Sequence, residues 1–295
     1  MRLGVVLPPE EIGVGPGAIR DYVQGAEALG YGYVDLLDHV LGADPTNRPG
    51  WTGPYTNKDV FQEPLVTHGF VAGVTKTIEM FTGVLILPQR QTALVAKQAA
   101  AIDVLSGGRL RLGVGLGWNE VEYQALGADF HNRGRRMEEQ VAVLRELWTK
   151  EVVTFHGQWH HIQEAGINPL PIQRPIPLWM GGSSDPALRR AARLADGWVP
   201  TYFNLEQAAG LVQKLHSNMR EAGRDPSTFQ IEGRLRLAGA SNDEWAAMYH
   251  GWGRLGATHF LVDTRRGGLT TVDAHLRALR QFMEALPGIK AAYKE

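Results

Sequence analysis

Residues 83–118 read GVLILPQRQTALVAKQAAAIDVLSGGRLRLGVGLGW, and this stretch decides the fold. It begins with a strand-like apolar run. A helix is predicted next, because Val95, Ala99 and Ile102 recur at the spacing of one buried helical face. Gly107 ends this helix, as a residue free to take positive φ should, and a second apolar run follows. A strand, a helix and a strand in this length predict a βαβ unit with parallel strands.

The same alternation runs through the whole chain. Strand-like runs recur at eight places: residues 3–7, 33–37, 78–87, 110–114, 178–180, 197–200, 229–237 and 259–262. Eight strands that alternate with about eight helices predict the α/β class and a (β/α)8 TIM barrel, as a single domain over residues 1–295. The alternative is an open doubly wound sheet, which usually carries a GxGxxG motif after its first strand. Residues 8–17 contain no such motif.

The alternation breaks at residues 151–177, which are rich in proline, aromatic residues and histidine. We interpret this stretch as an insertion that contains a small hairpin and covers a pocket. His156, His160 and His161 lie in it, but no nearby carboxylate completes a ligand motif, so we expect no metal site. Residues 40–58 form a second long loop, and long ordered loops are typically functional lids.

Composition limits the classes of function. The 295 residues include 30 basic and 31 acidic side chains, and this balance argues against a dedicated nucleic-acid binder. The chain has no cysteine, which excludes disulfides and thiolate nucleophiles. Its N-terminus lacks the pattern of a signal peptide, and it has no run of about 18 apolar residues that would span a membrane. We therefore expect a cytoplasmic protein that acts on a small molecule.

The carboxyl ends of the strands are where a TIM barrel carries its active site. Asp38 and His39 directly follow the second predicted strand. A histidine beside a carboxylate holds or delivers a proton near neutral pH, so this pair is the best acid–base candidate. The alternative reading is a structural pair that begins the long loop.

Two glycine-rich turns follow later strands. Each has a structural reading, as a simple turn or helix cap, and a functional one, as a place where backbone approaches a ligand closely. In the first turn a flat ligand would lie against the glycine backbone, with a tryptophan as a wall; in the second, free N–H groups at a helix start would bind a phosphate. The candidates are Gly115, Gly117, Trp118 and Asn119 in the first turn and Gly181, Gly182, Ser183 and Ser184 in the second.

Three blocks of the sequence resemble the luciferase-like monooxygenase superfamily. They are residues 82–127 (TGVLILPQRQTALVAKQAAAIDVLSGGRLRLGVGLGWNEVEYQALG), residues 133–148 (RGRRMEEQVAVLRELW) and residues 175–198 (PIPLWMGGSSDPALRRAARLADGW). Within that superfamily, the chain most resembles the branch of coenzyme F420-dependent oxidoreductases.

The resemblance implies a set of site residues. The cofactor would be coenzyme F420, or alternatively FMN, with its ring over the carboxyl ends of the strands. A non-prolyl cis peptide at Gly83–Val84 would back the ring, Asp38 and His39 would contact it, and residues 181–184 would bind its phosphate. A homodimer is also implied. Trp118 departs from the pattern, because the sugar-phosphate dehydrogenases of the superfamily carry a catalytic glutamate there.

The sequence therefore predicts hydride transfer between F420 and a small organic substrate, with His39 as the proton donor or acceptor. The first alternative is an FMN-dependent monooxygenase, in which reduced flavin activates dioxygen. The second is a non-enzymatic protein that binds a flavin or deazaflavin, because a fold alone does not prove an activity.

Overall fold

Eight parallel strands close into a barrel in the computed structural model, which describes residues 1–286. Each strand pairs with the next along the barrel, and the last pairs with the first, so this sheet has no free edge. The order is β1 (Arg2–Val6), β2 (Tyr33–Leu36), β3 (Glu79–Thr82), β5 (Leu110–Gly115), β8 (Leu178–Gly181), β9 (Gly197–Val199), β10 (Gln230–Arg236) and β11 (His259–Asp263). The predicted (β/α)8 barrel is confirmed.

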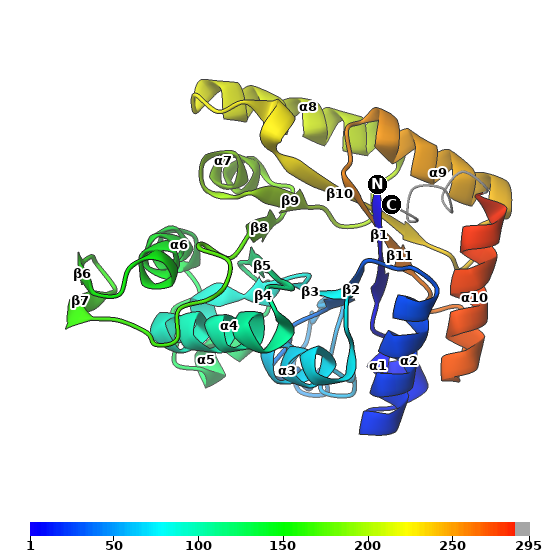
Figure 1. Cartoon of the computed structure of the whole chain (residues 1–295), viewed down its shortest axis with the longest axis horizontal. Coiled ribbons are helices and arrows are strands. Elements are labelled where there is room, and N and C mark those ends of the chain that lie inside the picture. The colour runs from blue at the N-terminus through cyan, green and yellow to red at the C-terminus, as the bar shows by residue number, and fades with distance from the viewer. Residues whose placement is uncertain (287–295) are drawn as a thin grey trace.

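Helices cover the outside of the barrel (Figure 1). The longer ones are α2 (Pro16–Ala28), α3 (Pro64–Val74), α4 (Thr92–Ser106), α6 (Arg133–Thr149), α7 (Asp185–Leu194), α8 (Leu205–Glu221), α9 (Asn242–Arg254) and α10 (Val272–Ala285). Short helices add α1 (Pro9–Ile12), α5 (Glu120–Ala125), η1 (Leu87–Gln89) and η2 (Pro226–Thr228). Among residues 1–286, none of the helices combines the length and the apolar character needed to cross a membrane.

The third predicted strand, residues 78–87, is not continuous. It forms β3, then a cis peptide bond between Gly83 and Val84, then β4 (Leu85–Ile86), which pairs with β5. The helix α3 begins at Pro64, because the carboxylate of Glu63 accepts the N–H of Val66 at 2.6 Å and caps the helix there.

Two apolar layers hold the barrel together. The larger one lies between the strands and the surrounding helices. The smaller one fills the inside of the barrel with inward-pointing side chains from six of its strands, as expected for a packed barrel interior. Its buried members are Val6, Tyr33, Phe81, Trp179, Val199 and Leu261, and Val84 packs against them.

The insertion at residues 151–177 forms the predicted hairpin, from β6 (Val153–His156) and β7 (His161–Ala165). It packs on the outside of α4 and α6, at the periphery of the molecule (Figure 1). His160 contacts Glu139 at 2.8 Å and Thr92 at 2.6 Å, and the side chain of Gln173 donates to Asp103 at 2.7 Å. The segment therefore does not cover the carboxyl ends of the strands, where the candidate active site lies; its last residues, 173–177, line a hollow at the amino ends instead.

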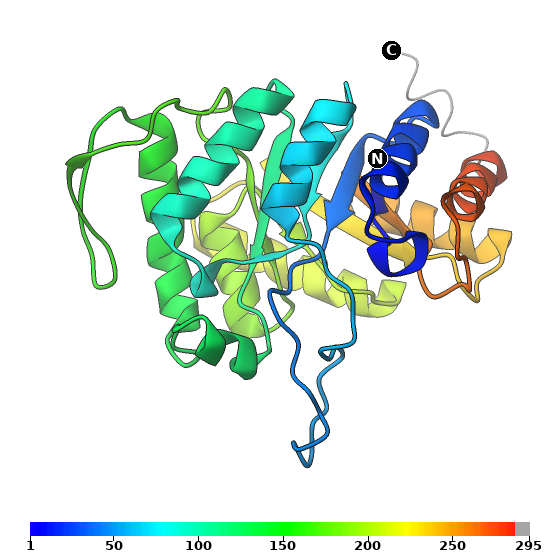
Figure 2. The same ribbon diagram turned by 90° about the horizontal axis from the view of Figure 1, so that it is seen from below.

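The loop between β2 and α3, in contrast, lies at the ends of the strands. It projects beyond the ends of the strands as a long segment, drawn in blue to light blue (Figure 2). Its aromatic side chains return toward the end of β2, as described below. We call residues 40–58 the lid.

Candidate active site

His39 lies three residues beyond the end of β2 and is held by a carboxylate from α5. Its Nδ1 is 3.2 Å from Oε2 of Glu122, whose side chain is fully buried. The other oxygen of Glu122 accepts the backbone N–H groups of Val40 and Leu41. One carboxylate thus fixes both the imidazole ring and the backbone that follows it.

This contact fixes which nitrogen of His39 carries the hydrogen in the neutral ring. An ionised carboxylate only accepts hydrogen bonds, so Nδ1 carries the hydrogen when it binds Glu122. Nε2 has no hydrogen-bond partner among residues 1–286. In neutral His39, Nε2 is therefore the free proton acceptor, and in the protonated ring it is the free donor.

Aromatic rings surround His39. The ring centroid of Phe61 is 4.8 Å away, that of Tyr55 is 5.2 Å away and that of Trp118 is 5.7 Å away. Trp51 from the lid lies 5.6 Å from Trp118. The lid and the turn after β5 therefore close on the same imidazole and exclude water from its sides.

Asp38 is bound in a different way from its neighbour. Its carboxylate accepts the N–H of Ile86 at 2.8 Å and forms an ion pair with Arg90 at 2.7 Å. Arg90 also contacts Glu63 at 2.7 Å. Burial raises the pKa of Asp38, and the charge of Arg90 opposes that rise. Both oxygens are occupied by these partners, so the arrangement favours a positioning role for Asp38 over proton exchange with a substrate.

The cis peptide brings two of the predicted glycines to one point. Val84 projects between β5 and β8, so a Cβ added at Gly115 would lie 2.4 Å from Cγ2 of Val84, and one at Gly181 would lie 3.1 Å from Cγ1. A Cβ at Gly83 would lie 2.2 Å from the carboxylate of Asp35. Glycine is needed at Gly115 and Gly83 because any side chain there would overlap a neighbour.

The turn after β5 continues this surface. Gly117 has a φ of +66°, which favours glycine, and it packs against Ile86. Asn119 is buried, and its side-chain nitrogen donates to the carbonyl of Leu41 at 3.3 Å, while its Oδ1 has no partner among the described residues. The amide of Gln89 is also buried without a partner. These orphaned groups fit the polar edge of a flat heterocycle, which would satisfy them.

The turn after β8 starts α7. Gly182 has a φ of +111°, and its carbonyl accepts the indole N–H of Trp198 at 2.8 Å. Ser184 is the N-cap residue of α7, yet its side chain makes no capping hydrogen bond. Ser183 is half-buried and Ser184 is exposed. The first N–H groups of α7 therefore lack a side-chain cap, which leaves them to an anion or to water.

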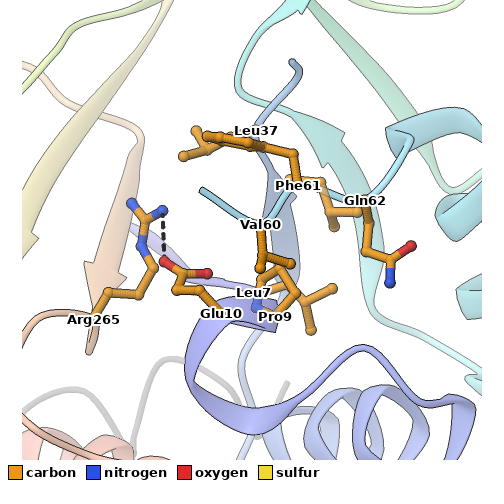
Figure 3. Close-up of a pocket in the computed structure, with 9 residues that line it drawn as sticks. Leu7, Pro9, Glu10, Leu37, Val60, Phe61, Gln62 and Arg265 are labelled. Carbon is orange, nitrogen blue, oxygen red and sulfur yellow. Dashed lines mark ion pairs between the residues drawn. The ribbon is translucent and has the colours of Figure 1, made fainter. Parts of the chain in front are cut away.

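A small cavity lies beside His39, at the ends of β1, β2 and β11 (Figure 3). Its volume of about 20 Å³ holds roughly one water molecule. Phe61 belongs both to this cavity and to the rings around His39. Arg265 and Glu10 form an ion pair at 3.7 Å on one side of it. The cavity is thus apolar on one side and charged on the other, and it is too small for a substrate.

Sequence reasoning missed Glu122 and the lid aromatics Trp51 and Tyr55. Glu122 left one usable signal, because it lies in the short helix that directly follows the glycine turn of β5. The lid aromatics left none, since their ring contacts are made by a loop without periodicity. The three histidines of the insertion do not gather into a metal site within residues 1–286.

A sequence model of the luciferase-like monooxygenase family matches residues 1–292. Among curated relatives, the F420-dependent glucose-6-phosphate dehydrogenase of Nakamurella multipartita is 31% identical over 229 residues, which cover 76% of this chain and 63% of that protein. The FMNH2-dependent dimethylsulfone monooxygenase of Pseudomonas putida is 33% identical over 158 residues, which cover 52% of this chain and 43% of that protein.

A solved structure has the same fold. The F420-dependent secondary alcohol dehydrogenase in complex with an F420–acetone adduct superimposes with a TM-score of 0.79. The superposition covers 97% of this chain and 98% of that one, at 18% sequence identity. At this identity the likeness establishes the barrel and its connections.

Proposed function

This chain belongs to the luciferase-like monooxygenase family, and on that premise we propose that it is a coenzyme F420-dependent oxidoreductase acting on a small organic substrate. The family and the relatives compared above are oxidoreductases and monooxygenases. The observation that carries the proposal is the pair formed by His39 and Glu122 at the strand ends, with Nε2 of His39 left free.

The chain's own part in the reaction is proton handling. When bound, F420 supplies C5, a carbon that gives or takes a hydride. As an alcohol-type substrate is oxidised, its carbon loses the hydride with both electrons, and Nε2 of His39 takes the hydroxyl proton. In reduction the same atom returns the proton to the carbonyl oxygen. Glu122 keeps the ring oriented and stabilises its protonated form.

The remaining site residues are proposed to orient the cofactor and to exclude water. Gly83 and Val84, with Gly115 and Gly181 beside them, form the support for a flat ring. Asn119 and Gln89 offer hydrogen bonds to its polar edge. The start of α7, at Gly182, Ser183 and Ser184, is proposed to receive the phosphate. Trp118, Tyr55 and Phe61 close the side next to His39.

The FMN-dependent monooxygenase is the second candidate, and the relative from Pseudomonas putida favours it. The two candidates differ in their cofactor, so one titration separates them. The full-length protein is titrated with F420 and, separately, with FMN while tryptophan fluorescence is followed, since Trp51 and Trp118 lie at the site. We expect saturable binding of F420. Tight binding of FMN without binding of F420 would overturn the first proposal, and oxygen uptake with FMNH2 would then support the second.

A further inference from the structure

The amino ends of the strands surround a second hollow, on the face of the barrel opposite the candidate active site. Its volume is about 600 Å³. The first residues of β1, β3, β5, β10 and β11 line it, together with the last part of the insertion, residues 173–177. Pockets for small organic ligands typically measure roughly 300–1,000 Å³, so the hollow is far larger than a bare ion requires.

Arg111 lines this hollow and lacks a partner. It is the second residue of β5, and its residue exposure is only 4%. Its guanidinium lies 4.3 Å from the ring centroid of Phe81, 4.4 Å from that of Trp179 and 4.6 Å from that of Tyr33. None of its three nitrogens has a hydrogen-bond partner among residues 1–286. The ring faces attract the charge but leave the N–H groups unsatisfied, which is costly for a buried cation.

The carboxylates near Arg111 are already engaged. Glu79 pairs with Arg2 at 2.6 Å. Glu232 accepts the hydroxyl of Tyr33 at 2.8 Å and pairs with Arg234 at 2.8 Å. No carboxylate of the described residues lies within ion-pair distance of Arg111. Among the described residues that line this hollow, Arg111 is therefore the cation that no carboxylate contacts.

Two more arginine side chains and a histidine line the same hollow. Arg145 is paired with Asp196 at 3.1 Å, so it adds no free charge. Burial, and after it the charges of Arg111 and Arg2, together lower the pKa of His259 to about 2. Of the charges that residues 1–286 place in this hollow, the one that remains free to attract an anion is therefore that of Arg111.

We propose that this hollow binds an organic oxyanion, a metabolite-sized carboxylate or phosphate whose anionic group pairs with Arg111. The planar guanidinium matches both groups through paired N–H donors. Pro175 and Pro177 offer an apolar wall for the rest of the molecule. The nitrogens of Arg111 are shielded from solvent, so side chains at the rim of the hollow have to move before an anion can reach them. Arg2, whose side chain is 38% exposed, is one of these rim side chains. This site is independent of the redox proposal.

The first test is thermal unfolding of the full-length protein with inorganic phosphate or succinate, at an ionic strength held constant with sodium chloride. We expect a saturable rise in Tm for the wild type with at least one of the two, and the responding probe identifies the class of oxyanion. Arg111→Met should abolish the rise and should leave the ligand-free protein at least as stable, because the thioether fills the aromatic cage without burying a charge. Arg135→Met, at an exposed position of α6, is the matched control and should respond as the wild type does.

A second variant decides the matter if Arg111→Met does not fold. Gln230 lines the hollow at the start of β10 and is exposed, so Gln230→Glu adds a carboxylate without a change of size. This fixed negative charge should weaken binding of the added anion about tenfold or more, measured by calorimetric titration. The proposal is overturned if neither phosphate nor succinate raises the Tm of the wild type, or if a folded Arg111→Met or Gln230→Glu variant binds as tightly as the wild type.

Discussion

Nδ1 of His39 lies 3.2 Å from Oε2 of Glu122, although the two residues are 83 positions apart in the sequence. The loop after β2 and the helix after β5 meet at this contact. It orients the imidazole, leaves Nε2 without a hydrogen-bond partner among residues 1–286 and joins the base of the lid to the turn at Trp118. The first two predictions follow from this pair.

Replacing the imidazole tests its role in proton transfer. We expect His39→Ala to lower kcat by about 10²–10⁴-fold, the range that general acid–base catalysis contributes, while the Kd for F420 changes little. Stopped-flow reduction or oxidation of F420 with an identified substrate measures the effect. His131→Ala is the control, since that side chain is 83% exposed. Full turnover in His39→Ala would remove His39 from the mechanism.

Glu122→Gln tests the positioning role of the carboxylate. An amide still accepts from the backbone N–H groups of Val40 and Leu41, but it no longer stabilises a protonated imidazole. We expect kcat to fall with KM nearly unchanged, and the pH profile of kcat to change shape. Glu120→Gln, an exposed neighbour in the same helix, should keep the wild-type profile. A loss of stability without a change in the pH profile would mean that Glu122 only supports the fold.

The ion pair between Arg90 and Asp38 predicts an asymmetric effect on stability. Arg90→Met leaves the buried carboxylate of Asp38 uncompensated, which should cost about 3–5 kcal/mol in the free energy of unfolding. The variant Arg90→Met/Asp38→Asn should recover part of that loss, because no buried charge remains. Glu63→Gln removes the charge of the partly exposed partner but keeps an amide oxygen that can accept the N–H of Val66, so it should cost less than about 1 kcal/mol. Urea denaturation measures all three, and equal losses for Arg90→Met and Glu63→Gln would contradict the assignment.

The close approach of Gly115 and Val84 predicts that a second substitution can restore the stability that a first one removes. Gly115→Ala places a Cβ 2.4 Å from Cγ2 of Val84, which is too close for two carbon atoms, and such overpacking typically costs roughly 1–3 kcal/mol. It should also weaken F420 binding, because Val84 belongs to the proposed support of the ring. The double variant Gly115→Ala/Val84→Ala removes the clash and should restore stability. If the second change brings no recovery, the two side chains do not share this space.

His259 predicts a dependence of stability on pH. Burial holds its pKa at about 2 in the folded protein, whereas the unfolded chain binds a proton near pH 6.5. Because the folded pKa is the lower one, the contribution is fully present above pH 6.5 and is lost as pH falls, by about 1.4 kcal/mol per pH unit. Relative to His259→Gln, the wild type should therefore lose stability between pH 6.5 and pH 5 in urea titrations. Parallel curves for the two proteins would contradict this prediction.

Much of the architecture follows from local patterns. Apolar runs, helical periodicity and terminal glycines predicted eight strands at nearly the observed residues, since each pattern depends on neighbours in sequence. The break at Gly83–Val84 was not evident from the apolar run itself, because both halves are equally hydrophobic; the family resemblance implied it. The sequence also did not show which part of the barrel the insertion packs against. Its contacts with Glu139 and Asp103 depend on the positions of α6 and α4 in the folded chain.

The sequence by itself determined the barrel and the ends of its strands, and it predicted His39 as the residue that moves a proton. Only the tertiary structure decided what each neighbour does: Glu122 orients His39, Arg90 occupies Asp38, and Arg111 is left without a partner in the barrel. The physical reason is closure. Periodicity places a side chain on a face within one element, whereas a hydrogen bond or ion pair needs two groups within a few ångströms, and in a barrel those groups come from distant parts of the chain.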